Sequence, residues 1–317
     1  MSDSPSPPPD SVAAEPAPAA RRAVHRPVLV REVLAAMALA PGMIVLDGTV
    51  GAGGHAAKIA QIVGPTGRVI GVDRDPMMLN LADAALRPFP WATVHQASHS
   101  ELRGLLDELR LDRADAALLD LGYSSDQLAD DARGFGFQIG DGRGGGPLDL
   151  RFDVRQGRPA AELLQEEDET ELTRLFTEYG EHPQAAKIAV AIVANRTYAP
   201  ICTAEDLAEL VERTAPAAGG SHPATRIFQA LRIAVNDELG HVQRTLSSAL
   251  PEVLKPDGRA AVLTFHSLED RLVKRAFVPA NGWKPVAKKP ATATPSEIRL
   301  NPRARSAKLR AAVRIVT

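Results

Sequence analysis

The sequence predicts an α/β fold in which a parallel sheet, covered by helices on both faces, is interrupted by an inserted all-helical domain. Short and nearly continuous apolar runs alternate with helical segments between residues 43 and 120, and this alternation returns after residue 224. Strands buried on both faces of a parallel sheet have this composition. Between these parts, residues 160–215 have only helical periodicity, which predicts a separate helical unit.

The first half of the predicted sheet consists of repeated strand and helix units. Pro41 and Gly42 end a first helix, and Asp75-Pro76 opens a later one, as expected for residues that stop and start helices. The predicted strands are 43–47, 68–73, 92–95 and 116–120, and the predicted helices are 31–39, 54–63, 76–86 and 100–110.

The pattern changes after Ser125, because the glycine-rich residues 140–147 are too flexible for a buried strand. Residues 185–193 are apolar almost all round, which predicts the centre of a helical bundle. Thr203 is expected to cap the helix that follows it. The predicted elements of this second half are helices at 160–164, 169–179, 185–195, 204–214 and near 224–253, a strand at 260–265 and a helix at 268–277.

These patterns divide the chain into three parts. Residues 1–24 contain six prolines and almost nothing to bury, so we expect a disordered leader. Residues 25–127 and 222–317 are expected to form the α/β core, and residues 128–221 the inserted helical domain. An insert of roughly 90 residues can hold a small core of its own.

The composition is that of a soluble globular protein, with 44% hydrophobic and 24% charged residues among 317. Cys202 is the single cysteine, which excludes an internal disulfide and a metal site built from cysteines. A reducing, cytoplasmic location is therefore expected. The leader lacks the apolar segment of a signal peptide, and no run is long enough to span a membrane.

The charge is distributed unevenly along the chain. Residues 271–317 carry twelve Lys or Arg and one acid, Glu297, although the whole protein has a net charge of −2. A basic end on an acidic body is typical of a protein that binds nucleic acid. A solvated tail with no partner is the alternative, and charge alone does not separate the two.

A glycine-rich turn between two acids is the strongest indication of function. An apolar run ends at Asp47, glycines follow at 48–54, and a second apolar run ends at Asp73. This strand–loop–helix–strand unit is suited to a nucleoside. The glycines allow close approach of the backbone, and the carboxylate of Asp73 can accept hydrogen bonds from ribose hydroxyls.

The same loop fits a dinucleotide pattern, because residues 51–56 match G-x-G-x-x-A, but such a match is weak on its own. Asp47 lies four residues before Gly51 and gives D-x-x-x-G-x-G. This arrangement resembles the first motif of S-adenosylmethionine (SAM) methyltransferases. A glycine turn with no function is a further alternative, which the spacing to Asp73 makes less favourable.

Polar residues also follow the other predicted strands, at 96–100, 120–125 and 266–270. Because the carboxyl ends of parallel strands meet at one edge of a sheet, these groups are expected to converge with Asp47 and Asp73. No G-x-S-x-G motif is present, which argues against a serine hydrolase. The histidines at 25, 55, 99 and 266 lack the spacing of metal ligands, so no metal is predicted.

Taken together, these segments resemble the RsmH (MraW) family, bacterial SAM-dependent methyltransferases that modify cytosine N4 in 16S rRNA. His222-Pro223-Ala224-Thr225-Arg226 and Asn301-Pro302-Arg303-Ala304-Arg305-Ser306 are typical of this family rather than of methyltransferases in general. The other matching segments are 25–29, 47–55, 73–76, 119–125, 134–137, 147–153, 228–232 and 265–271.

The resemblance implies a Rossmann-like SAM-dependent methyltransferase core with an inserted helical domain that helps to hold the cytidine. It implies that SAM is contacted by Gly53, Gly54, His55, Asp73, Asp120 and Gln127. A further contact is usually aromatic, and His99 stands there, where an imidazole can cover an adenine face. The glycines at 140–146 make the insert longer than the family pattern.

Methylation of a cytosine amine requires a group that orients one N–H and accepts charge, because the amine lone pair is delocalised into the ring. Amino-methylating enzymes of DNA place an acidic or amide residue after the fourth strand, and Asp120 occupies this frame. We expect Asp120, or the carbonyls of Leu121 and Gly122, to be the catalytic acceptor. Asp120 could instead only line the cofactor site. Tyr123 is expected to stack on the base or to belong to the core.

The remaining candidates concern RNA. His266 and its neighbours could orient the base, or Ser267 could cap the next helix with Asp270 as its partner. Five arginines are expected to contact phosphates, or else to form surface ion pairs: Arg226, Arg232, Arg271, Arg303 and Arg305. The target cytosine must leave any base stack to reach a buried methyl group.

The resemblance implies 16S rRNA as the partner, within the small ribosomal subunit and near the decoding centre, and no membrane. A small-molecule methyltransferase would share the first half of the chain but would not need the basic end. A binding module without catalysis would keep the fold and bind SAM weakly. The sequence leaves open the choice between free rRNA and the assembled subunit, and between a monomer and a homodimer.

Overall fold

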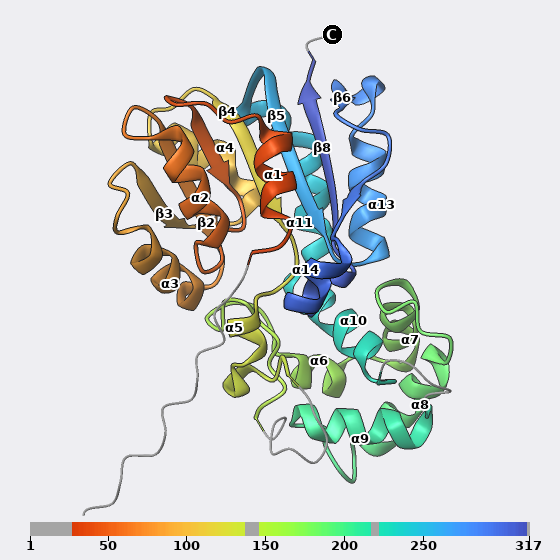
Figure 1. Cartoon of the computed structure of the whole chain (residues 1–317). Helices are drawn as coiled ribbons and strands as arrows, with labels where there is room; N and C mark the ends of the chain where they lie inside the picture. Colours follow the sequence, from red (N-terminus) through yellow and green to blue (C-terminus); the bar gives the residue numbers. More distant parts are fainter. Residues whose placement is uncertain (1–26, 137–145, 217–221, 316–317) are drawn as a thin grey trace, which may run out of the picture.

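The protein is described by a computed structural model, which covers residues 27–136, 146–216 and 222–315. The predicted leader at 1–24 and most of the glycine-rich run at 140–146 lie outside the described residues. Figure 1 shows a sheet flanked by helices, with a second group of helices beyond one end of the strands.

The described residues contain an eight-stranded sheet in the order β3-β2-β1-β4-β5-β8-β6, with β7 also paired to β8. The first five of these strands are parallel, and β8 runs antiparallel to β5. The strands are β1 (Ile44–Asp47), β2 (Arg68–Asp73), β3 (Ala92–Gln96), β4 (Ala114–Asp120), β5 (Leu254–Thr264), β6 (Trp283–Pro285), β7 (Ala291–Thr292) and β8 (Lys308–Arg314). The predicted α/β fold is confirmed.

Helices cover both faces of the sheet. Along β1, Val45 packs with α1, α2 and α3, whereas its neighbour Leu46 packs with α4, α11, α12 and α13. This alternation follows from the two-residue period of a strand. The helices of the core are α1 (Val30–Met37), α2 (Gly54–Val63), α3 (Pro76–Leu86), α4 (Leu102–Glu108), α5 (Ser125–Leu128), α11 (Glu238–Arg244), α12 (Leu250–Val253), α13 (Ser267–Ala276) and α14 (Pro295–Leu300).

A separate hydrophobic cluster lies among α6 (Ala160–Glu166), α7 (Glu169–Glu178), α8 (Ala185–Asn195), α9 (Ala204–Thr214) and α10 (Thr225–Asn236). Phe176 and Ile188 are fully buried there. Helix α10 contributes Leu231 to this cluster, although the predicted boundary at 221 and 222 assigned it to the core. The predicted domain boundaries remain predictions.

Three sequence expectations can be compared with the helices directly. Thr203 caps α9, as predicted, because its hydroxyl accepts from the Asp206 amide at 3.1 Å. The continuous helix expected at 224–253 is wrong, since Asp237 adopts φ 47° between α10 and α11 and a π-helical turn follows at Thr245–Ala249. Helix α8 is not buried all round, because Val190 is 47% exposed.

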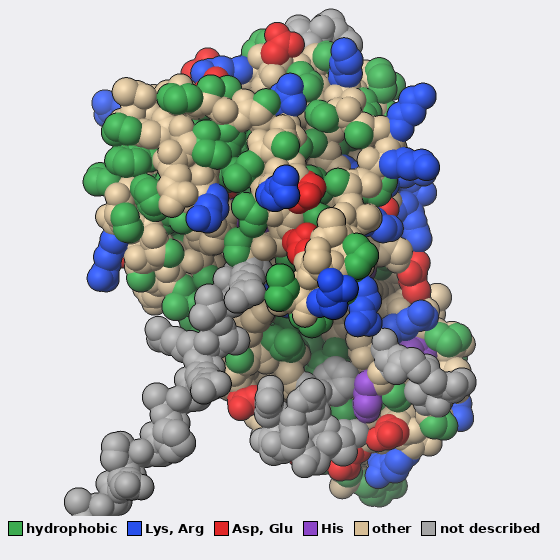
Figure 2. Space-filling model, in the orientation of Figure 1, with side chains coloured by type: hydrophobic (Ala, Val, Ile, Leu, Met, Phe, Trp, Pro, Cys, Tyr) green, Lys and Arg blue, Asp and Glu red, His purple; other side chains and the backbone are tan. Residues whose placement is uncertain are grey.

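Figure 2 shows Lys and Arg side chains gathered on the side of the molecule that carries β6, β8 and α13. Across the described ranges of the chain, no helix has the length and apolar character needed to cross a membrane. Within the same ranges, no three His, Cys, Asp or Glu side chains converge as ligands for a metal ion.

Candidate functional site

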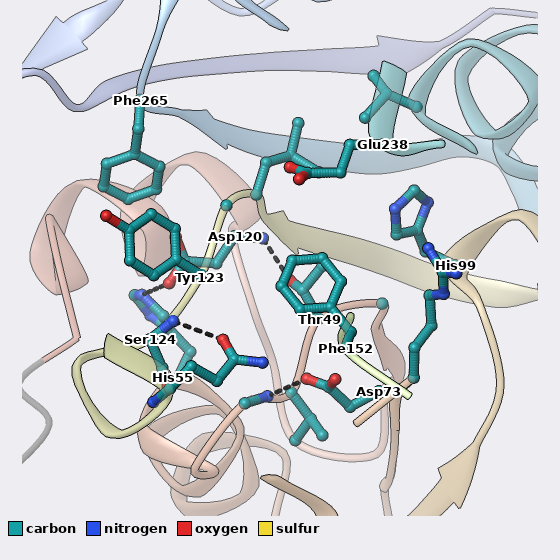
Figure 3. Close-up of a pocket in the computed structure, with 18 of the residues that line it drawn as sticks. Thr49, His55, Asp73, His99, Asp120, Tyr123, Ser124, Phe152, Glu238 and Phe265 are labelled. Carbon is teal, nitrogen blue, oxygen red and sulfur yellow. Dashed lines mark hydrogen bonds and ion pairs between the residues drawn. The ribbon is translucent and has the colours of Figure 1, made fainter. Parts of the chain in front are cut away.

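One pocket lies at the carboxyl ends of the central strands (Figure 3). Eight of the predicted site residues line it: Gly54, His55, Asp73, His99, Asp120, Tyr123, Gln127 and Arg303. Six others do not: Gly53, Arg226, Arg232, His266, Arg271 and Arg305. The structure therefore brings together the residues that follow β1, β2, β3 and β4, as the topology predicts.

The turn after β1 needs glycine for steric reasons. Gly53 has φ +84°, and a Cβ there would lie 3.2 Å from the Ala82 Cα. A side chain at this position would be strained and would separate α2 from α3. Gly53 thus faces α3 and allows the turn to form, whereas Gly51 and Gly54 line the pocket.

Asp73 ties the second strand to the glycine turn. Its Oδ2 accepts from the Gly51 amide at 3.0 Å, and its Oδ1 accepts from the Asp75 amide at 3.0 Å. Burial raises the pKa of Asp73 to about 6, against the lowering effect of these amides. The backbone amide of Arg74 also acts on this carboxylate. Because a carboxylate offers about four lone-pair sites, it can still accept a hydrogen bond from a ligand hydroxyl.

Three ionisable groups meet at the ends of β1 and β4. Asp47 is 1% exposed, and burial raises its pKa to about 7 against the effect of the nearby His55 charge. The Nε2 of His55 lies 3.5 Å from Asp120 Oδ2. Burial lowers the pKa of His55, but its interactions with Asp120 and Asp47 outweigh burial, so that pKa is raised.

This cluster is not satisfied by the protein itself. Both ring nitrogens of His55 and the Oδ1 of Asp120 are buried and make no hydrogen bond within the described residues. Buried polar atoms almost always have a partner. Because these atoms belong to pocket-lining residues, their arrangement fits a bound ligand that carries both polar groups and positive charge.

The loop after β3 holds His99 in a rigid frame. Ser98 caps the short helix His99–Glu101, and its amide donates to Glu101 Oε2 at 2.8 Å. The Nδ1 of His99 lies 2.6 Å from the Thr245 hydroxyl. Burial, followed by the charges of His241 and Arg74, lowers the pKa of His99 to about 3.

Gln127 closes the pocket through its neighbours. Its amide nitrogen donates to Asp75 Oδ2 at 2.8 Å, and its carbonyl accepts from the Ser124 amide at 2.8 Å. Arg133 reaches the same Asp75 oxygen at 2.7 Å. These hydrogen bonds connect the start of α5 to the residue that precedes α3, and they fix the Gln127 side chain where it lines the pocket.

The predicted arginines fall into different environments. Arg303 donates to the Tyr123 carbonyl and to the Ser125 hydroxyl, and it lines the pocket. Arg232 is 7% exposed and makes two hydrogen bonds to Glu238, at 2.8 and 3.1 Å. A buried, paired guanidinium is not available to a phosphate, so the structure does not favour the predicted phosphate contact for Arg232.

The exposed arginines also differ. Arg226 donates to the carbonyl of Glu181, and Arg271 pairs with the carboxylate of the same residue at 3.1 Å. Arg305 is exposed and forms no ion pair with any described residue. Among these three arginines, therefore, only Arg271 forms an ion pair with an acidic side chain of the described residues.

The predicted capping of α13 by Ser267 and Asp270 is wrong. The Glu269 carboxylate accepts from the Phe265 amide at 2.8 Å and lies 3.2 Å from the His266 Nε2. Ser267 instead donates to Glu181 at 2.6 Å, and Asp270 pairs with Arg310 and Lys308. A glutamate is long enough to reach back to the start of the helix, which is why it displaces the serine.

Several pocket residues were not predicted, and they come from segments far apart in sequence: Phe152, Glu238, His241 and Phe265. Phe152 lies between α5 and α6, and its amide donates to Asn236 Oδ1 at 2.9 Å. The next residue, Asp153, accepts from Gln96 at the end of β3 at 3.1 Å. The only signal for Phe152 in the sequence was that the segment 147–153 resembles the family pattern.

Comparison with known proteins identifies the family of the chain. The model of the MraW methylase family matches residues 22–315. A ribosomal RNA small subunit methyltransferase H from Symbiobacterium thermophilum is 42% identical and aligns with 92% of this chain and 96% of its own. The protein of the same name from Trichlorobacter lovleyi is 44% identical, with 92% and 98% covered.

Among solved structures, a SAM-dependent methyltransferase from Aquifex aeolicus aligns with 91% of this chain and 90% of its own, at 12% identity and a TM-score of 0.41. The family model and the relatives span nearly the whole described chain, including the glycine turn, the Asp73 strand and the Asp120 loop. On this evidence the chain belongs to the MraW methylase family, with S-adenosylmethionine as its cofactor.

Proposed function

We propose that this protein transfers the methyl group of SAM to the exocyclic N4 of a cytosine in 16S rRNA, near the decoding centre of the small subunit. The observation that carries the proposal is a pocket lined both by the glycine turn and Asp73 and by Asp120, Tyr123 and Arg303. The names of the two relatives, both small subunit rRNA methyltransferases, support the substrate class.

The residues present fit the cofactor. Asp73 can still accept a hydrogen bond from a ribose hydroxyl, and Gly51 and Gly54 leave room beside the backbone. The acidic pair Asp47 and Asp120 suits a ligand with a positive sulfonium. In this assignment Gly54, His55, Asp73, His99, Asp120 and Gln127 line the cofactor site, and Gly53 shapes it.

SAM supplies a methyl group that its positive sulfonium already activates, so the protein mainly has to position and deprotonate the amine. Forming the new N–C bond releases one proton from N4. We assign its acceptance to Asp120 Oδ1, which is buried without a partner. The Asp120 amide donates to the Thr49 hydroxyl at 2.5 Å, and this contact holds the residue at the pocket floor.

Tyr123 is the proposed platform for the cytosine. The guanidinium carbon of Arg232 lies over the Tyr123 ring, 4.5 Å from its centre. The ring of Phe135 is stacked with it, with 6.1 Å between the two ring centres. Arg303 holds the carbonyl of Tyr123. Figure 3 places Tyr123 and Phe265 on one side of the pocket and Asp73 on the other. The base would have to be flipped out of any stack to reach this position.

Among its described residues, the insert contributes one loop residue, Phe152, to the pocket lining. We propose that residues 128–221 form a substrate-binding domain, because the loop before α6 carries Phe152 into the pocket. The contacts of this loop with Asn236 and Gln96 join the insert to both halves of the core. A base held there would lie between the insert and the Asp120 loop.

The basic side of the molecule is the proposed contact with the rRNA backbone. Exposed cations with no acidic partner among the described residues include Lys274, Arg275, Lys284, Lys288, Lys289, Arg299 and Arg305. They belong to α13, the β6–β7 edge and the segment after it, the side on which Figure 2 shows the blue side chains. Unpaired cations of this kind bind phosphates without reading sequence.

The test is transfer of labelled methyl from SAM to unmethylated small subunits and, separately, to naked 16S rRNA, with nucleoside mass spectrometry of the product. We expect label as N4-methylcytidine. Asp120→Asn should reduce the rate by about 100-fold or more while SAM still binds, as for loss of a general base. Label on another atom would overturn the assignment to N4, and no label on any RNA would overturn the rRNA substrate.

A further inference from the structure

We propose that His99 recognises the adenine amine of the cofactor through a hydrogen bond to its Nε2, and that Thr245 fixes the imidazole tautomer that makes this possible. The proposal rests on the cofactor site described above and adds to it an edge contact that selects one base. His99 belongs to the loop after β3, and Thr245 belongs to the π-helical turn at Thr245–Ala249.

The position of His99 follows from the sheet. Asp73 pairs in register with Gln96 of β3, so the loop that follows Gln96 lies beside the carboxylate assigned to the ribose. A base attached to a ribose held there would lie near this loop. Gly48 permits the approach of His99, since a Cβ at Gly48 would lie 3.0 Å from the His99 Cβ and 2.4 Å from a Leu119 methyl.

The tautomer follows from counting protons. The Thr245 hydroxyl donates its single hydrogen to the His241 carbonyl at 2.8 Å. It can therefore only accept at its 2.6 Å contact with His99 Nδ1, so Nδ1 carries the proton. The Nε2 of His99 is then a bare acceptor, and no hydrogen bond to it occurs within the described residues.

The environment keeps this ring neutral. The charged and titratable groups that face it are His241, Arg74 and Arg244, and with burial they lower the pKa of His99 to about 3. His241 lies edge-on at 6.1 Å and is held by the Ser98 and Ser100 hydroxyls at 2.9 and 2.8 Å. A neutral imidazole with a free Nε2 is therefore maintained throughout the physiological pH range.

A bare acceptor in a pocket selects a ligand that offers a donor. The exocyclic amine of adenine is such a donor, whereas the corresponding oxygen of hypoxanthine would place a lone pair against the lone pair of Nε2. Sites built around a hydrogen bond reject analogues that lack it, because a buried group is left without its partner. His99 would thus form a hydrogen bond with the edge of the base in addition to any packing against its face.

Two measurements test the proposal without RNA. The first is ¹⁵N NMR of the histidine rings, in which His99 is expected as the Nδ1–H tautomer in the free protein. The second is calorimetric binding of S-adenosylhomocysteine and S-inosylhomocysteine. The native protein is expected to prefer the adenosyl compound by roughly 10- to 100-fold, the effect of one unsatisfied hydrogen bond.

The variants separate the hydrogen bond from packing. His99→Phe should still cover the base but reduce the preference to less than about threefold. Thr245→Val should release the tautomer and lower the preference, and Thr245→Ser should restore it. Thr93→Val is the matched control, because it removes a similar 3.0 Å contact to His95 on β3, outside the pocket.

Each outcome decides the question. An Nε2–H tautomer for His99, or an unchanged preference in His99→Phe, would overturn the proposal even if the protein methylates rRNA. If Thr245→Val does not fold, the His99→Phe and Thr245→Ser results and the NMR spectrum still decide it. Normal discrimination with no methylation of any RNA would support this inference while removing the proposed substrate, and failure to bind either compound would overturn the cofactor assignment itself.

Discussion

The guanidinium of Arg232 lies 4.5 Å from the ring centre of Tyr123 and is paired at the same time with the buried carboxylate of Glu238. A cation stacked on an aromatic ring and fixed by an acid has little freedom to move. Tyr123 therefore rests on a rigid support that links α10 to α11. This pairing explains why Arg232 does not face solvent as a phosphate ligand would.

Replacing Arg232 should mainly affect stability. We expect Arg232→Ala to lower the free energy of unfolding by about 3–5 kcal/mol, because Glu238 is left buried and unpaired. Urea denaturation measures this loss. Arg226→Ala, at an exposed position, should change stability by about 0.5 kcal/mol or less. If Arg232→Met combined with Glu238→Leu is no more stable than Arg232→Ala, the proposed cost of the lone carboxylate is wrong.

The affinity for SAM should depend on pH between about 5.5 and 7.5. The pKa values of Asp47 and Asp73 are raised to about 7 and about 6, so both carboxylates take up protons as the pH falls through this range. Loss of negative charge weakens binding of a cation, and His55, whose pKa is also raised, gains positive charge in the same direction. We expect SAM to bind roughly tenfold more weakly at pH 5.5 than at pH 7.5.

Calorimetry in two buffers of different ionisation enthalpy checks this expectation, since binding should release protons near pH 6.5. The same groups predict the pH dependence of folding. Their carboxyl pKa values are higher in the folded protein than the ordinary 3.8, so stability should decrease as the pH rises from about 4 to 7. Asp47→Asn should flatten both profiles, and an unchanged SAM profile in that variant would contradict the role of Asp47.

The lysines of the β6–β7 edge should contribute charge but no sequence preference to RNA binding. We expect the triple change of Lys284, Lys288 and Lys289 to Ala to reduce the slope of log affinity against log salt by roughly 2–3. A salt titration of 16S rRNA binding measures it. Changing Lys58, Arg68 and Arg87 to Ala is the matched control. These cations are also exposed, but they belong to α2, to β2 and to the residue after α3, in the other half of the core. If both triple variants reduce the slope equally, the β6–β7 edge is not a specific contact site for the RNA backbone.

The side chain of Asn236 should hold Phe152 in its position in the pocket lining. Its side chain accepts from the Phe152 amide and donates to the Leu150 carbonyl at 2.7 Å, and its own carbonyl accepts from Arg74 at 2.6 Å. We expect Asn236→Ala to cost about 2 kcal/mol of stability and to weaken SAM binding severalfold, since buried partners are left unsatisfied. Denaturation and calorimetry measure the two effects.

Asn281→Ala is the control for that prediction. Asn281 also donates to two backbone carbonyls, of Arg275 and Ala276, but it is exposed and distant from the pocket lining. Its replacement should change neither SAM binding nor, beyond about 0.5 kcal/mol, stability. A SAM affinity that is unaffected by Asn236→Ala would show that the pocket lining does not depend on this side chain.

Sequence alone predicted the parallel part of the sheet well, because β1, β2 and β4 are short apolar runs that end in acids. The helices α2, α3, α8 and α9 begin and end where the pattern places them. The strands β6, β7 and β8 were not predicted. β6 and β7 are only two or three residues long, and β8 alternates apolar residues with charges. The pairing of β8 with β5, and of β6 and β7 with β8, is a tertiary contact that no local pattern reports.

The candidate site was predicted where it depends on strand ends, and missed where it depends on packing between distant segments. Asp73 and Asp120 end their strands and Tyr123 comes shortly after β4, so topology places them at one edge. The roles of Glu238 and Thr245 could not be predicted, because each is defined by a partner far away in sequence. The ion pair of Arg232, one of its two predicted alternatives, could not be located for the same reason: its acid partner follows a left-handed residue, Asp237, that interrupts an expected helix.

The order of strands in the sheet has a consequence for synthesis of the chain. Strand β5 pairs with β4 although the whole helical insert separates Asp120 from Leu254. While the ribosome is still making the insert, the edge of β4 that β5 will cover has no partner, and open strand edges favour wrong association. The helices of the insert make mainly local contacts and can form first. Maturation of the protein would then end, rather than begin, with completion of the sheet that carries its pocket.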